Sequence, residues 1–199
     1  MTRVRSCSFF IIAVVGMWGV GCQLRRPNTV PNRMIEPHLL DPQLTEAVKE
    51  AAKAPNATPI RLLETQARGH IGRRLLHQLP NGELAEDPVW LWSSLPSQYL
   101  DTALRMEVAS DPDLRLVDTA SASTVAATLL VWNLESSSET RLVGAVEFEF
   151  TGTDRVIHSK VTRASEPVTG EMPGDLAAVA GRLLRHLASE GLKSVPSAR

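Results

Sequence analysis

The side chains that most often carry out catalysis are present in this chain, but their spacing matches no recognised site. Five histidines occur, His38, His70, His77, His158 and His186, and none stands at metal-ligand spacing from another His, a Cys or a carboxylate. A zinc site is therefore not expected. Serines are numerous, yet the chain has no Gly-x-Ser-x-Gly elbow, phosphate-binding loop or dinucleotide fingerprint. The sequence predicts no catalytic residue, no metal and no cofactor.

Two carboxylates stand at a spacing that could support acid–base chemistry. Glu147 and Glu149 are separated by one residue and alternate with Phe148 and Phe150. This alternation is typical of a strand with one face in the core and the other in water. We therefore interpret the two glutamates as a solvated outer face and the chain as non-enzymatic. A hydrolase with an unrecognised site is the alternative, and loss of an activity on substitution of one Ser or His would reveal it.

The N-terminal segment is typical of an export signal. Arg3 and Arg5 precede Phe9–Gly21, an uncharged run of 13 residues. The basic head and short apolar run favour a secretory leader over a spanning helix, which needs about 20 apolar residues. The ending Gly19-Val20-Gly21-Cys22 resembles a bacterial lipobox, which implies cleavage after residue 21 and lipidation of Cys22. An uncleaved anchor helix and cleavage by ordinary signal peptidase are the alternatives.

Charge and cysteine content limit what the exported part can do. Without residues 1–21, 19 Lys and Arg face 22 Asp and Glu, so the formal net charge is −3. This balance predicts no nucleic-acid partner, because phosphate binding needs clustered cations. Cys7 lies in the leader and Cys22 is the only other cysteine. The exported domain therefore forms no internal disulfide and depends on its own hydrophobic core.

The exported chain divides into a tether and one folded domain. Residues 22–58 hold five prolines that interrupt regular structure, Pro27, Pro31, Pro37, Pro42 and Pro55. We expect a Pro-rich tether here. A short docked helix over residues 43–54, capped by Asp41, is one interpretation of its middle, and a partly ordered linker is the other. The folded domain is expected over residues 59–195, with a frayed tail at 196–199.

Residue periodicity within 59–195 predicts an α+β domain. Candidate strands cover 60–67, 71–79, 83–85, 114–117, 125–135, 141–151 and 155–164, and the last three form an antiparallel meander. Two helices with apolar stripes are expected, from about Pro96 to Ala109 and over Asp175–Leu192. The expected architecture is a two-layer sandwich: a mainly antiparallel sheet with two amphipathic helices packed on one face. Phe148 and Phe150 should lie under Leu183 and Leu187.

Three aromatic side chains form the one concentration that these elements leave unexplained. Trp90, Trp92 and Tyr99 lie close together at the predicted entry to the first helix. One interpretation places them in the core beneath that helix. The other makes them a contact surface for a partner or a lipid, because Trp and Tyr are enriched at interfaces.

The run Arg74–Leu84, the sequence Trp92-Ser93-Ser94-Leu95-Pro96 and the helix to Leu104 resemble the auxiliary lipoproteins of ABC-type transport systems. The paraquat-inducible protein C-like group is the nearest type. The resemblance extends over residues 59–195, through the meander and the terminal helix. It implies a non-enzymatic accessory of an MCE-type system that moves phospholipid or other hydrophobic cargo. The implied partners are an MCE-domain protein and its ABC permease and ATPase.

The same resemblance implies a place in the cell envelope. Gln23 follows Cys22, which suggests delivery to the periplasmic side of the outer membrane, with the protein held in the bilayer by its lipidated cysteine. A homo-oligomer is left open. The alternative function is an envelope assembly lipoprotein that binds and regulates an outer-membrane or peptidoglycan synthesis machine.

Overall fold

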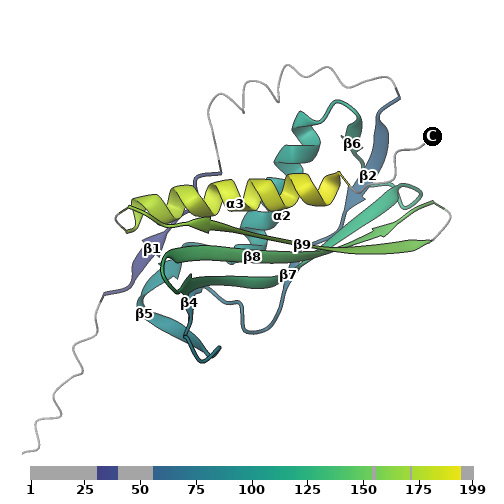
Figure 1. Cartoon of the computed structure of the whole chain (residues 1–199). Helices are drawn as coiled ribbons and strands as arrows, with labels where there is room; N and C mark the ends of the chain where they lie inside the picture. The colour runs from purple at the N-terminus through teal and green to yellow at the C-terminus, as the bar shows by residue number, and fades with distance from the viewer. Residues whose placement is uncertain (1–30, 40–55, 154–155, 171, 194–199) are drawn as a thin grey trace, which may run out of the picture.

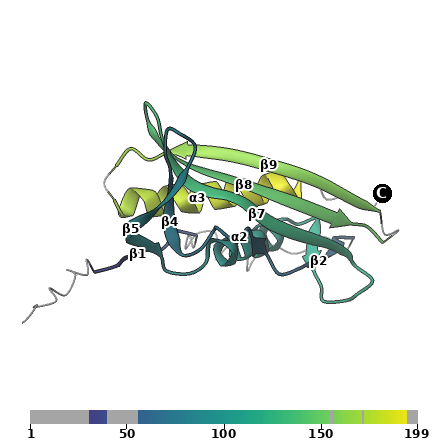
Figure 2. The ribbon, with the colours of Figure 1, turned by 90° about the horizontal axis from the view of Figure 1, so that it is seen from below.

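The computed structural model describes residues 31–39, 56–153, 156–170 and 172–193. The predictions for the leader, Cys22, the helix over 43–54 and the tail lie outside these residues. Within them, nine strands form one sheet, and helices α2 (Pro96–Ser110) and α3 (Gly174–Leu192) lie on the same side of its long strands (Figures 1 and 2). The predicted α+β class with two helices on one face is confirmed.

Three long strands form the predicted meander. They are β7 (Ser123–Ser136), β8 (Thr140–Thr151) and β9 (Ile157–Pro167), and each pairs antiparallel with the next. Strand β8 has the clearest period-two pattern in the sequence, and the short turns between the three strands leave little alternative to antiparallel pairing. The long ladders of the sheet are therefore antiparallel, as expected.

Six shorter strands extend the sheet beyond β7, mostly by parallel pairing. They are β1 (Arg33–Ile35), β2 (Thr58–Leu62), β3 (Gln66–Ala67), β4 (Arg74–Gln78), β5 (Leu84–Trp92) and β6 (Leu114–Leu116). Strands β2, β3 and β4 pair in parallel with successive parts of β7, which is long enough to hold all three. Strand β1 pairs in parallel with β5, and β2 with β6. The periodicity did not predict these parallel contacts.

Residues 31–39 belong to the folded domain, so the prediction of a tether reaching residue 58 was wrong for this segment. Arg33–Ile35 pair with Trp90–Trp92, and Ile35 and Leu39 are buried in the core. The backbone N–H of His38 donates to the carbonyl of Ala177 on α3, at 3.1 Å. A three-residue strand between two prolines shows no periodicity, and its position depends on β5 and α3.

Strand β5 continues well past the predicted return strand over residues 83–85. Pro88 suggests that the strand ends early. The strand nevertheless continues to Trp92, with an irregularity in its register with β4. The carboxylate of Asp87 accepts the backbone N–H groups of Val89 and Trp90, each at 2.8 Å. These bonds satisfy the backbone where the ladder is interrupted, so β5 reaches Trp92.

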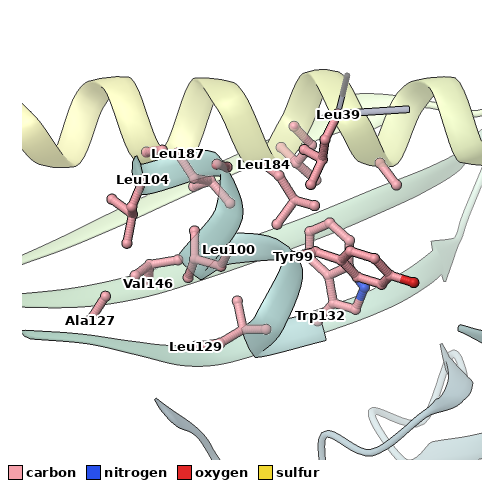
Figure 3. Close-up of a cluster of buried hydrophobic side chains, with 14 of the residues drawn as sticks. Leu39, Tyr99, Leu100, Leu104, Ala127, Leu129, Trp132, Val146, Leu184 and Leu187 are labelled. Carbon is pink, nitrogen blue, oxygen red and sulfur yellow. The ribbon is translucent and has the colours of Figure 1, made fainter. Parts of the chain in front are cut away.

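The core lies between the long strands and the two helices. Figure 3 shows Leu100 and Leu104 of α2 and Leu184 and Leu187 of α3 converging on the sheet beside Val146. Phe148 and Phe150 are buried as expected, with ring centroids 6.2 Å apart. Gly191 lies directly against the ring of Phe148, and Leu187 lies against Gly144. The contact of Phe148 on α3 is thus one helical turn beyond Leu187.

Candidate functional site

The three aromatic residues Trp90, Trp92 and Tyr99 differ in their burial in the structure. Trp92 has no exposed surface, and its ring centroid lies 5.7 Å from that of Trp132, with the planes at 52°. Trp90 is partly exposed, and the guanidinium carbon of Arg33 lies 5.5 Å from its ring centroid, a cation–π arrangement. Tyr99, on α2, is buried except for 6% of its surface. Trp92 is therefore a core residue, while Trp90 and the edge of Tyr99 remain accessible.

The hydroxyl of Tyr99 links the segment after β1 to the start of α2. It accepts the backbone N–H of Ser94 at 2.8 Å and donates to Oε2 of Glu36 at 3.0 Å. The side chain of Ser93 is a further partner of the hydroxyl, and the backbone N–H of Ser93 donates to the carbonyl of Ile35 at 2.9 Å. Residues 35–36 and 93–94 are thus held together around one phenol group.

Burial is the largest influence on this phenol, and it raises the pKa of Tyr99 above its ordinary value. The hydrogen bond to Glu36 and the charge of that carboxylate act in the same direction, whereas the bonds from Ser93 and Ser94 oppose them. The net effect favours the protonated hydroxyl. Tyr99 can therefore act as a hydrogen-bond donor and acceptor, and it has no feature of a general base.

A cavity of about 470 Å³ lies beside Tyr99, between α2 and the segment that follows β1. Pro37, Leu39 and Tyr99 supply apolar surface, and Glu36, Gln98 and Thr102 supply polar groups. This combination, a mainly apolar lining with a few polar groups, is typical of a small-molecule site. Ser94 and His38 also line the cavity, but among the described residues no hydrogen bond joins them, which is the contact that would activate the serine.

A second cavity of about 490 Å³ lies along α2 and shares Gln98 and Thr102 with the first. Its other groups are more polar. Asp101 accepts from Arg105 at 2.7 Å and from the hydroxyl of Thr65 at 3.4 Å. The first half of α2 is thus bordered by an apolar cavity and by a polar one. Neither had a signal in the sequence, because both are formed by segments distant along the chain.

His77 has a partner that residue spacing did not reveal. Its Nε2 lies 2.8 Å from Oδ2 of Asp87 across the β4–β5 hairpin. Burial raises the pKa of Asp87, but the N–H groups of Trp90 and Val89 and the pair with His77 outweigh it and leave that pKa lowered. Because Asp87 also holds the irregular part of β5, we interpret this pair as structural.

Metal-ligand clusters and membrane-spanning helices are both absent from the described residues. No group of three or more His, Cys, Asp and Glu side chains gathers there as metal ligands would. No helix in the same residues has the length and apolarity needed to cross a membrane. The acidic pair Glu147 and Glu149 lies on the face of the sheet away from the helices, as expected of a solvated outer face.

Comparison with known proteins identifies the fold. No protein-family model matches the chain, and no curated protein is significantly similar to it. The crystal structure of protein XCC0632 from Xanthomonas campestris, of family DUF330, matches with a TM-score of 0.62 at 13% identity, over 79% of this chain and 91% of that one. The hypothetical protein CT253 from Chlamydia trachomatis matches with a TM-score of 0.51 at 11% identity, over 69% of this chain and 94% of that one. At these identities the likeness establishes the fold alone.

Proposed function

We propose that the chain is a lipid-anchored periplasmic lipoprotein and a non-enzymatic accessory of an ABC/MCE-type transport system for phospholipid or other hydrophobic cargo. The lipobox-like sequence at Cys22 and the family resemblance over residues 59–195 support this proposal. The observation that carries it is the apolar cavity beside Tyr99, which is built from the first folded segment after the proposed anchor. Its place near the anchor suits a protein that handles apolar cargo at a membrane.

The length of chain between anchor and domain is short. Eight residues, Gln23–Val30, separate Cys22 from Pro31, where the described part begins. A fully extended chain spans about 3.3–3.6 Å per residue, so this link reaches about 30 Å at most. A tether of the length expected from the prolines would have allowed several times that reach. The short link therefore keeps the domain, and the cavity after β1, close to the bilayer surface.

In this proposal the cavity receives the apolar end of a lipid or of a partner's side chain, and Glu36 and Gln98 contact its polar end. The partners are an MCE-domain protein and its permease and ATPase, and the location is the periplasmic side of the outer membrane. Affinity capture of the full-length anchored chain should enrich the MCE-domain protein. Enrichment of peptidoglycan or outer-membrane synthesis proteins instead would favour the assembly role and contradict the transport role.

Substitution Cys22→Ser should abolish lipidation and release the protein from the membrane. The thiol is the acyl acceptor, and stable anchoring needs more than one acyl chain. Cells fed labelled palmitate should incorporate label into the wild-type protein and not into Cys22→Ser, with the variant lost from the membrane fraction. Cys7→Ser, a matched change in the leader, should keep both label and location. Label on Cys22→Ser, or a mature protein that retains residues 1–21, would contradict the proposal.

Substitution Thr102→Trp should block lipid binding at the cavity. Thr102 is exposed on α2 and lines the cavity, so an indole there occupies the space without disturbing the core. We expect photo-crosslinking of an anchored wild-type chain to a photoactivatable phospholipid to fall about tenfold, which corresponds to ~1.4 kcal/mol of binding free energy. Arg105→Trp is the control, because Arg105 lines the second cavity and not the first. Equal labelling of wild type and Thr102→Trp would remove the cavity from the proposed function.

A further inference from the structure

Strand β9 forms an exposed edge of the sheet. Within the described part of the chain it pairs with β8 and with no other strand. Its outer face carries two strongly exposed β-branched side chains, Ile157 at 66% and Val161 at 56% of their surface. An edge strand of eleven residues with exposed apolar side chains is a template for pairing with another strand.

The register of β8 with β9 shows which backbone groups of the edge are open. The N–H of Val168 donates to the carbonyl of Thr140, and the carbonyl of Val156 accepts from Gly152, so even-numbered residues of β9 bond to β8. In an antiparallel ladder the alternate residues direct their N–H and C=O groups to the opposite side. The odd-numbered residues, from Ile157 to Arg163, therefore direct theirs away from the sheet. These are also the residues whose side chains lie on the outer face.

Charges beside this edge are complementary to one another. Glu149 and Glu147 lie next to Ser159 and Val161 on the outer face, and within the described residues no Lys or Arg forms an ion pair with either glutamate. Arg163 lies further along the same edge. Its side chain is 63% exposed, and its guanidinium forms an ion pair with Glu135 of β7 at 3.1 Å. The edge thus has two glutamates without an ion pair near one end and an arginine near the other, and a two-fold axis between them brings each opposite the other.

We propose that the chain forms a two-fold homodimer in which β9 pairs antiparallel with β9 of a second copy, centred on Val161. In this register Val161 opposes Val161 of the second copy, and Ser159 opposes its Arg163. That arginine then exchanges its exposed ion pair with Glu135, which contributes little stability, for one with Glu149 or Glu147 across the interface. The two sheets join into one, and the interface is isologous, because each copy contributes the same surface.

The registers centred on Lys160, Thr162 and Arg163 are less favourable. A centre at Lys160 or at Arg163 places each of these cations opposite itself, and like charges directly opposite are destabilising. A centre at Thr162 opposes Val161 with Arg163 and brings Pro167, which has no N–H to donate, opposite Ile157. The register centred on Val161 avoids all three penalties. The dimer does not depend on the proposed transport role.

Disulfide crosslinking tests the register directly. Hydrogen-bonded antiparallel partners have Cα atoms about 5.5 Å apart, within the range of a disulfide. Full-length Val161→Cys in membranes should therefore form a covalent dimer on mild oxidation. The control Ser159→Cys should not, because four residues of offset separate its two copies by roughly 13 Å. The wild-type chain, oxidised under the same conditions, is the background control for any crosslink that forms through Cys7 or Cys22. Absence of the Val161→Cys dimer, or equal crosslinking of both variants, would overturn the proposal.

The mass of the detergent-solubilised full-length chain is a second test. Val161→Lys places two ammonium groups face to face on the axis, so the mass measured by light scattering should fall from that of a dimer to that of a monomer. Ala126→Lys is the matched control, because Ala126 lies on the outer face of β7, two strands from the edge. The measured mass of this variant should remain that of a dimer. A monomeric wild type, or β9 paired with a different protein, would overturn the proposal.

Discussion

Replacement of Trp92 by alanine should lower the free energy of unfolding by about 3–5 kcal/mol, the cost of removing a large side chain from a packed core. Trp92 has no exposed surface and packs against Trp132. It also ends β5 next to Ile35 of β1, its partner in the sheet. Its loss leaves a cavity in the core beside Trp132. Denaturant unfolding followed by circular dichroism measures the change.

Trp90→Ala is the matched control for this prediction. Trp90 is two residues away on the same strand but is partly exposed, and its stacking under Arg33 is worth about 0.5–1 kcal/mol at such a site. Its removal should therefore cost much less stability than removal of Trp92. Equal losses in the two variants would contradict the division into a core and a surface tryptophan. Of the two, only Trp90 is suited to report on a partner contact, because any effect of Trp92→Ala includes loss of stability.

Gly181→Ala should destabilise the protein by about 1–3 kcal/mol, the usual cost of overpacking. A Cβ at this position would lie 2.3 Å from the carbonyl oxygen of His38 and 2.7 Å from its carbonyl carbon. Both are backbone atoms, so residues 36–39 have to move away from α3. The bond from His38 N–H to Ala177 is then lost, together with the packing of Leu39. Denaturant unfolding measures the effect.

Gly174→Ala provides the control, because a Cβ there meets no atom within 4 Å and Gly174 belongs to the same helix. Gly181, in the helix interior, gains up to about 1 kcal/mol of helix propensity on substitution, and Gly174, the first residue of α3, gains less. A lower stability of Gly181→Ala than of Gly174→Ala therefore reports the contact with residue 38. A stability for Gly181→Ala equal to or above that of Gly174→Ala would show that the segment after β1 does not pack on α3 as described.

The sequence by itself determined the elements whose patterns are local and long. Strand β8 repeats its apolar residues at every second position, β7 is a long and mostly apolar run, and α2 and α3 repeat their apolar residues at helical spacing. Such patterns identify an element before its partners are known. The short turns between the long strands then determined their antiparallel order, and the acidic outer face of β8 followed from the same alternation.

Tertiary structure alone decided the contacts between segments far apart in the chain. Strand β1 is three residues long and is defined by its pairing with β5. No local sequence pattern could therefore distinguish it from the tether. The pair His77–Asp87 and the cavity at Tyr99 depend on register and on the path of residues 36–39. Trp90 and Trp92 have the same residue type and both pair with β1, but only Trp92 is fully enclosed in the core, against Trp132. Local periodicity reports which side of an element is apolar, whereas the partner that covers that side is set by long-range packing.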